Sequence, residues 1–303
     1  MRIRLNPIVK KDLQVSSRSM RISWGLFAYE GVLVLAFLLA LLVIQEETQS
    51  FYYGGNIYSY LVYLFPVIAI VQVCIVALIA PIITASAISG EKERQTFDIM
   101  LTTCMSPFSI VLGKVFSAVL RILFFVIASL PIMGMSFVVG GLSWMNLLYF
   151  ILAVMLLAIF SGSVGILCSA FCRKSITAVI LSFVIYFVVY GGTFMPLLLT
   201  TILNYSSNNV GEAMLPLLFN PILFFEEFFC FIMMGSSLLE EANFRTTDVG
   251  YITYYLAQGK GWMFVSAGCI LLLSFLLMLL AAWKVNPMHS SAGRKPGKKK
   301  GGE

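Results

Sequence analysis

The residues best suited to chemistry lie in a short polar segment, 90–103, between two apolar runs that are each long enough to cross a bilayer. Its sequence, GEKERQTFDIMLTT, begins with four consecutive ionisable residues: Glu91, Lys92, Glu93 and Arg94. Apolar residues then recur three or four positions apart: Phe97, Met100, Leu101 and Cys104. This spacing predicts a short amphipathic helix at the membrane surface. Its apolar edge would either contact a protein in the cytoplasm or rest on lipid headgroups.

The rest of the chain lacks the side chains that most enzyme and metal sites require. The single histidine, His289, lies near the C-terminus, so the small-residue segment 161–165, SGSVG, has no base to activate a nucleophile. We interpret that segment as small residues that allow close helix packing. Cys168 and Cys172 are one helical turn apart without further ligands nearby, which favours packing over metal binding. The sequence contains no GxxxxGK[ST] phosphate loop, so no ATP and no other cofactor is expected on this chain.

Composition assigns the chain to the helical membrane proteins. Hydrophobic residues make up 60% of its 303 residues and charged residues 11%, whereas soluble domains contain about 25% charged residues. A helix needs about 20 apolar residues to cross a bilayer. Six runs reach this length, at about 25–45, 60–88, 115–139, 146–171, 176–200 and 262–283. The alternating pattern of a membrane β-barrel is missing. We therefore predict an all-α polytopic membrane protein with six transmembrane helices.

The distribution of basic residues predicts the orientation. Lys and Arg favour cytoplasmic loops, and all but three of the 20 fall on one side of the predicted spans. The exceptions are Arg245 and Lys260 on the other side and Arg121 within a span. Both termini are therefore expected in the cytoplasm. Residues 1–24 are predicted to form a basic amphipathic helix along the cytoplasmic interface. Residues 25–284 form the six-span domain, and 285–303 form a disordered basic tail.

Because both termini are expected on the same side, the number of membrane crossings must be even. The apolar segment 214–234 is therefore not expected to cross the membrane. Counting it as a seventh span would place the Lys-rich tail outside. The segment also contains Pro216, Pro221 and two glutamates, and a helix in lipid must satisfy its backbone groups internally. We predict a bent or re-entrant helical segment within a large outer region, 201–261, between the fifth and sixth spans.

Two charged residues lie within the predicted spans, Glu30 in the first and Arg121 in the third. A charge at the centre of a bilayer costs about 2.5–3.5 kcal/mol on insertion scales, so such residues normally face protein or water. Both residues lie near the cytoplasmic edge. The two hypotheses are an ion pair that stabilises the fold and a carboxylate that lines a transport pathway.

The segment 89–114 resembles the first cytoplasmic loop of the permeases of type 2 ATP-binding-cassette (ABC-2) transporters. The residues that match this loop position by position are Glu91, Glu93, Thr96, Asp98, Leu101, Thr102, Thr103, Ser106, Pro107, Gly113 and Lys114. Cys104 departs from the pattern, because proline is frequent at that position. Asn6-Pro7 and the basic residues after it resemble the interfacial connecting helix of the same family.

The resemblance implies a multi-pass permease of a prokaryotic cell membrane, which exports its substrate. Such permeases pair with an identical or homologous permease and bind two ATPase subunits, which hold ATP and Mg²⁺. No nucleic acid is expected among the partners, and lipid surrounds the spans. The resemblance assigns the coupling to the ATPase to Glu91, Lys92, Glu93, Arg94, Thr96, Phe97, Asp98, Met100, Leu101, Thr102 and Thr103.

Two other classes stay open at this point. An ion-coupled secondary transporter normally carries several intramembrane polar groups and two repeated halves, whereas here one acidic residue lies in the spans and no repeat is visible. A non-transporting sensor subunit that signals through an ATPase would have the same sequence features. The substrate is not predicted by the sequence.

Overall fold

The computed structural model describes residues 20–50, 61–96, 106–140, 143–203, 213–236, 256 and 260–285. Within this part of the chain every regular element is a helix. Six stretches are long and apolar enough to cross a membrane: Ile22–Glu46, Leu64–Glu93, Pro107–Ala128, Trp144–Phe171, Ser175–Thr200 and Gly261–Val285. The prediction of an all-α protein with six spans is therefore confirmed.

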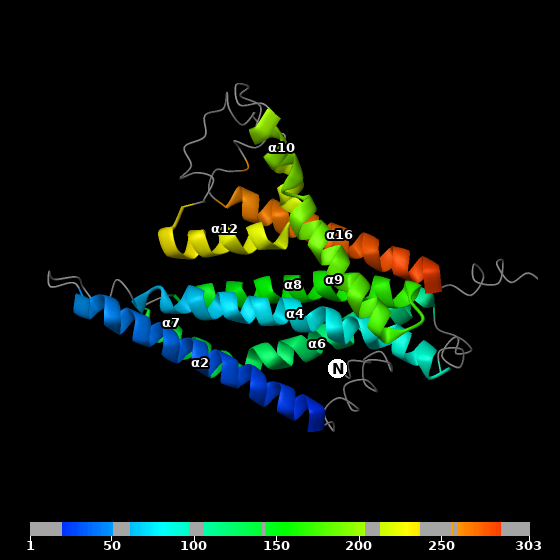
Figure 1. The fold of residues 1–303 in the computed structure, drawn as a ribbon, viewed down its shortest axis with the longest axis horizontal. Helices are drawn as coiled ribbons and strands as arrows, with labels where there is room; N and C mark the ends of the chain where they lie inside the picture. Colours follow the sequence, from blue (N-terminus) through cyan, green and yellow to red (C-terminus); the bar gives the residue numbers. More distant parts are fainter. Residues whose placement is uncertain are drawn as a thin grey trace, which may run out of the picture.

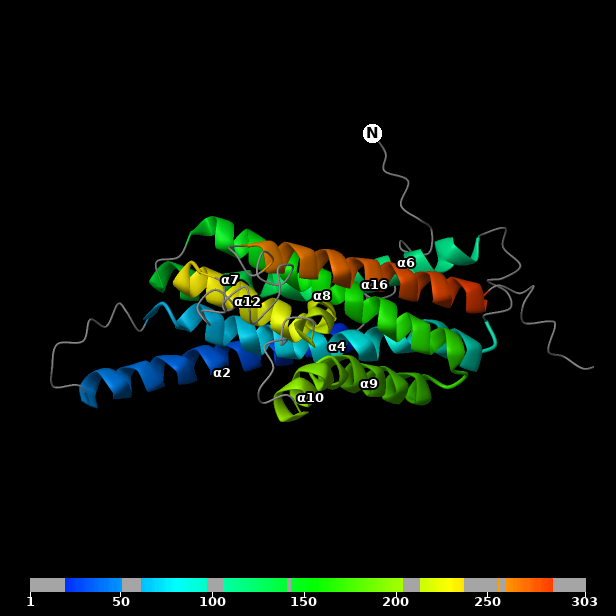
Figure 2. The same ribbon diagram turned by 90° about the horizontal axis from the view of Figure 1, so that it is seen from above.

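The spans correspond to the long helices of Figure 1. They are α2 (Met20–Ser50), α4 (Leu64–Glu93), α6 (Pro107–Ala128), α8 (Trp144–Phe171), α9 (Ser175–Gly192) and α16 (Gly261–Val285). A short helix, α10 (Met195–Leu203), continues the fifth span after a break at its outer part. Most of the helices run along the long axis of the molecule, whereas α9 is inclined to it (Figures 1 and 2).

Helix α8 forms the centre of the bundle. It packs against α4, α16, α6, α9 and α12, and its segment 161–166 is completely buried. Gly165 faces Thr84 of α4 so closely that an added Cβ would lie 2.8 Å from the Thr84 Cβ. In a membrane the hydrophobic effect does not drive helices together, so their association depends on van der Waals contacts. Small residues strengthen these contacts because they let two helices approach closely. The packing role predicted for the segment 161–165 agrees with this arrangement.

One end of the bundle collects most of the described basic residues. The end of α4, the start of α6, the α8–α9 junction and the end of α16 lie together there, at the right of Figure 1. Lys284 of α16 lies 5.3 Å from the ring centre of Phe171 at the end of α8. Lys92, Lys114, Arg173 and Lys174 lie at the same end, as the topology prediction requires. The assignment of this end to the cytoplasm stays a prediction.

The third span differs from its predicted bounds of 115–139. Helix α6 begins eight residues earlier, at Pro107, because the Ser106 hydroxyl accepts from Ser109 N at 3.3 Å and proline suits the first helical turn. The helical run also divides at Ser129 into α6 and α7 (Leu130–Val139). Pro131 has no N–H to continue the α6 hydrogen bonds, so the chain bends there. Gly113 and Lys114 consequently belong to α6 instead of to a loop.

The segment 214–234 forms two short helices, as a bent segment requires, and does not form a seventh span. The 3₁₀ helix η1 (Leu215–Phe219) is followed by α12 (Pro221–Met234). At about 1.5 Å per residue α12 is too short to cross about 30 Å of hydrocarbon. Asn220 makes the bend: its side chain accepts from Ile222 N and donates to Tyr190 O and Thr193 Oγ1 of the fifth span.

The other domain predictions fall largely outside the described residues. Only the last part of the predicted interfacial helix, 1–24, is described, and there α2 begins at Met20. The tail 285–303 is described only at Val285, and the outer region 201–261 is described in part.

Candidate functional site

The charged residues of the polar segment end helix α4 and do not begin a separate helix. Glu91, Lys92 and Glu93 occupy its last turn, and Arg94 is its C-cap. Gln95 has a left-handed backbone with φ 57. Gln95 N donates to Lys92 O at 3.2 Å, and Thr96 N donates to Glu91 O at 3.0 Å. These two bonds are the pair that closes a Schellman motif, which satisfies the last carbonyls of a helix.

Glu91 connects α4 to α6. Its Oε1 accepts a charged hydrogen bond from Lys114 Nζ at 2.8 Å. Lys114 is only 4% exposed and lies two turns into α6. The other carboxylate oxygen, Oε2, is buried without a hydrogen-bond partner among the described residues. A buried charge that loses its partner is strongly destabilising, so this pair fixes the spacing between the two helices on either side of the polar segment.

Lys92 connects α4 to the end of α8. Its Nζ donates to Ser169 O at 3.2 Å, to Ala170 O and to Cys172 O at 3.3 Å. The last carbonyls of a helix have no partner within it and carry partial negative charge. A lysine from a neighbouring helix therefore caps the C-terminal end of α8.

Glu93 connects α4 to the start of α9. Its two carboxylate oxygens accept from Ser175 N and Ser175 Oγ, both at 2.9 Å. Ser175 is the first residue of α9, whose N-cap residue Lys174 makes no side-chain cap. Negative charge is favourable at a helix N-terminus because the first N–H groups are unpaired. Glu93 thus provides the cap from another helix.

Ser169 adds a second tie between α4 and α8. Its buried hydroxyl accepts from Ile88 N at 2.9 Å and from Ser89 N at 2.7 Å. We call the set formed by Glu91, Lys92, Glu93, Lys114, Ser169 and Ser175 the helix-end clamp. The clamp joins one end of α4 to α6, α8 and α9, so these four helix ends cannot shift independently.

The comparison with protein families agrees with this architecture. A family model described as "ABC-2 family transporter protein" matches residues 7–284. The chain belongs to this family. A comparison with curated protein sequences found no match. The chain is therefore a multi-pass membrane permease component of an ABC transporter, as the segment 89–114 indicated, and the helix-end clamp lies at the base of that segment.

The structure changes the interpretation of the charged residues in the ABC-2 segment. The resemblance assigned Glu91, Lys92 and Glu93 to coupling with the ATPase. In the structure each of them bonds to another helix of this chain, and their coupling role stays a prediction. Arg94 is exposed at the end of α4. The remaining predicted coupling residues, Phe97, Asp98, Met100, Leu101, Thr102 and Thr103, lie outside the described residues, so their role stays a prediction.

Sequence reasoning missed Ser169 and Ser175 as members of the clamp. They are 80 and 82 residues from Ser89 and Glu93 along the chain, and a serine near a predicted helix end has no signature that names its partner. The proximity of two carboxylates and two basic residues at 91–94 was a signal for ion pairing. It did not show which of them would bond to which helix.

The predicted ion pair between Glu30 and Arg121 is not formed among the described residues. Glu30 Oε1 is buried and has no hydrogen-bond partner there. Arg121 Nε instead donates to Ser117 O of its own helix at 3.4 Å. The ion pair and a pathway role for Glu30 both stay hypotheses.

Proposed function

We propose that this chain is the membrane-spanning subunit of an exporter in a prokaryotic cell membrane. In this proposal it pairs with a second permease chain, and two separate ATPase subunits bind ATP and Mg²⁺ and supply the energy. Membership of the ABC-2 family supports the permease and the ATPase partner. The clustering of described basic residues at one bundle end supports the proposed orientation, with both termini in the cytoplasm.

The observation that carries the coupling proposal is the helix-end clamp. The segment 97–105 connects α4 to α6, and the clamp ties both of its flanking helices to each other through Glu91 and Lys114. A force applied to this segment by a moving ATPase is therefore delivered to α4 and α6 together. Lys92 and Glu93 pass the same displacement to α8 and α9. Packed helices respond to such displacements as rigid bodies.

In the proposed mechanism the apolar residues Phe97 and Leu101 dock in a groove of the ATPase. ATP binding moves the ATPase subunits, and the docked segment moves with them. The clamp then displaces the ends of four helices at once, which changes access to the translocation pathway. The chain itself carries out no chemical step; it converts the motion of its partner into helix movement.

The test introduces a charge into the proposed docking edge. Phe97→Glu and Leu101→Glu should each bury an unpaired charge at the interface with the ATPase, which costs several kcal/mol. Each should reduce co-purification of an ATPase encoded by an adjacent reading frame by at least about tenfold, which corresponds to about 1.4 kcal/mol. ATP hydrolysis by the complex should fall in parallel.

The matched control is Ile176→Glu, which places the same charge on an apolar side chain of α9 that is 75% exposed at the same bundle end. All three variants must reach the membrane in equal amounts. Undiminished co-purification of both docking variants would refute docking through this edge. An intact complex that hydrolyses ATP but moves no substrate across reconstituted vesicles would instead identify a sensor subunit.

A further inference from the structure

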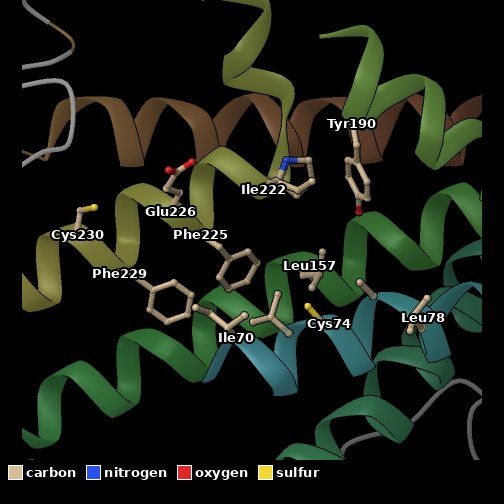
Figure 3. A pocket seen from close by; sticks show the side chains of 13 residues that line it. Ile70, Cys74, Leu78, Leu157, Tyr190, Ile222, Phe225, Glu226, Phe229 and Cys230 are labelled. Atoms are coloured by element: carbon tan, nitrogen blue, oxygen red, sulfur yellow. The ribbon is translucent and has the colours of Figure 1, made fainter. Parts of the chain in front are cut away.

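A cavity of about 640 Å³ lies between α4 and α12. Ile70 and Ala77 belong to its α4 wall, and Phe225 and Phe229 belong to its α12 wall. Tyr190 of α9 and Leu157 of α8 also line it, and Figure 3 shows the two phenyl rings directed at α4 and α8. The cavity lies in the half of the bundle away from the helix-end clamp, beside α12 (Figure 1). Its volume is in the range of cavities that hold small molecules.

One carboxylate borders this apolar space. Glu226 of α12 lines the cavity and is exposed, and it makes no ion pair or hydrogen bond with any described residue. Figure 3 shows its carboxylate directed away from the rings of Phe225 and Phe229. The next residue, Glu227, is only 4% exposed and has interactions within the protein. Of these adjacent carboxylates, Glu226 is thus the one available to a ligand.

Aromatic rings supply a second attraction for positive charge. The ring centroids of Phe225 and Phe229 are 6.2 Å apart, so the two rings form a continuous aromatic wall. The faces of such rings carry negative partial charge and attract cations, more strongly where water is excluded. Most of the other lining side chains are aliphatic, so a ligand must also have an apolar body. A carboxylate, aromatic rings and apolar walls together select for one chemical class.

We propose that the α4–α12 cavity binds a lipophilic cation. Its apolar body occupies the space between Ile70 and the rings of Phe225 and Phe229, and its positive centre lies towards Glu226 at the edge. A lipophilic anion of the same shape is disfavoured by the same carboxylate. The inference rests on the proposed transport function in one respect: the bound cation is a transported substrate only if the chain is an exporter. Binding itself requires neither the ATPase nor ATP.

The experiment measures equilibrium binding of tritiated tetraphenylphosphonium to the full chain in phospholipid nanodiscs, with empty nanodiscs subtracted. Tetraphenylborate, an anion of closely similar shape, tests the sign of the charge. Native protein should bind the cation saturably and should not bind the anion saturably. Glu226→Gln should weaken binding of the cation by about tenfold, the effect expected from a partly exposed charge contact. Ala77→Trp should abolish binding by filling the cavity.

Two control variants match these changes in chemistry. Glu46→Gln removes an exposed carboxylate from α2, on the opposite side of the bundle from α12 (Figure 1), and should bind like native protein. Ile82→Trp places the same bulky residue on an exposed position of α4 outside the cavity and should also bind normally. Size-exclusion profiles establish that each variant is folded.

Several results would overturn the proposal. Cation binding that Glu226→Gln changes by less than twofold would remove the carboxylate from the site. Binding that survives Ala77→Trp would place the ligand elsewhere. Equal saturable binding of tetraphenylborate, or no saturable binding of either ion, would assign the cavity to lipid chains. None of these results bears on the coupling proposal, whose own test is co-purification of the ATPase with Phe97→Glu.

Discussion

The helix-end clamp and the α4–α12 cavity lie towards opposite ends of the bundle and use carboxylates differently. In the clamp, Glu91 and Glu93 each bond to a partner on another helix. In the cavity, Glu226 makes no ion pair or hydrogen bond with a described residue. The clamp is therefore a set of internal contacts that hold helix ends together. The cavity leaves a charge available beside apolar walls.

The difference teaches that charge alone does not identify a binding site in a membrane protein. The clamp is the most charged part of the described chain, yet its charges stabilise helix ends and an interhelical ion pair. The cavity is lined by a single charged residue, Glu226, which makes no ion pair or hydrogen bond with a described residue. The four predictions below test this contrast by the free energy of unfolding, in order of decreasing effect.

The largest effect is expected from Lys114→Met. This change removes the cation but keeps most of the side-chain volume, so Glu91 is left as an uncompensated, partly buried charge. Breaking such a pair from one side should lower the free energy of unfolding by about 3–5 kcal/mol. Unfolding in dodecyl sulfate measures this change.

The double variant Glu91→Gln/Lys114→Met is the internal control for that pair. Because it removes both charges, its loss of stability should be smaller than the sum of the two single losses. Strict additivity of the two changes would show that the ion pair does not couple α4 to α6.

A smaller loss is expected from Lys92→Met. The change removes a charged donor from three carbonyl oxygens at the end of α8. Water can make some of the lost hydrogen bonds, because Lys92 is only partly buried. A hydrogen bond to a charged group contributes about 1.5–3 kcal/mol. Hydrogen exchange at the end of α8 should rise, while exchange near Asn220 should stay unchanged. Equal protection of the α8 end in both proteins would contradict the capping role.

Gln95→Gly should increase stability slightly. Gln95 has a left-handed backbone at the end of α4, which costs an L-residue about 1 kcal/mol and glycine almost nothing. The greater backbone entropy of unfolded glycine offsets part of the gain. The control, Thr96→Gly, removes a side chain that donates to Glu91 O at 3.3 Å and should not increase stability. A loss of stability in Gln95→Gly would mean that the helix does not end in this conformation.

Glu226→Gln should leave the free energy of unfolding within about 0.5 kcal/mol of the native value, as surface substitutions usually do. The reason is that the carboxylate makes no ion pair or hydrogen bond with a described residue that the amide would lose. Unfolding in dodecyl sulfate, which measures the loss of stability in Lys114→Met, also measures this value, so the two regions are compared directly. A loss as large as that of Lys114→Met would reveal a structural role for Glu226 and end the contrast between clamp and cavity.

The sequence predicted much of the fold because the bilayer restricts the possible structures. Apolar runs of sufficient length and the distribution of Lys and Arg were enough to find six helices. The predicted helix ends were less accurate near prolines, because a proline can either begin a helix or interrupt one. Pro107 begins α6, whereas Pro131 helps to divide the same helical run, and apolar content does not distinguish these positions.

The class, the number of spans and the family of this protein could all be predicted from its sequence. Each depends on local information: apolar length, charge bias and a motif in continuous order. The partners of Glu91, Lys92 and Glu93 became known only from the three-dimensional structure. Glu93 meets Ser175 across 82 residues, and Glu226 and Glu227 differ although they are neighbours. Hydrogen bonds and ion pairs depend on distances between helices, which are set by packing contacts such as Gly165 against Thr84 and are not encoded in any single segment.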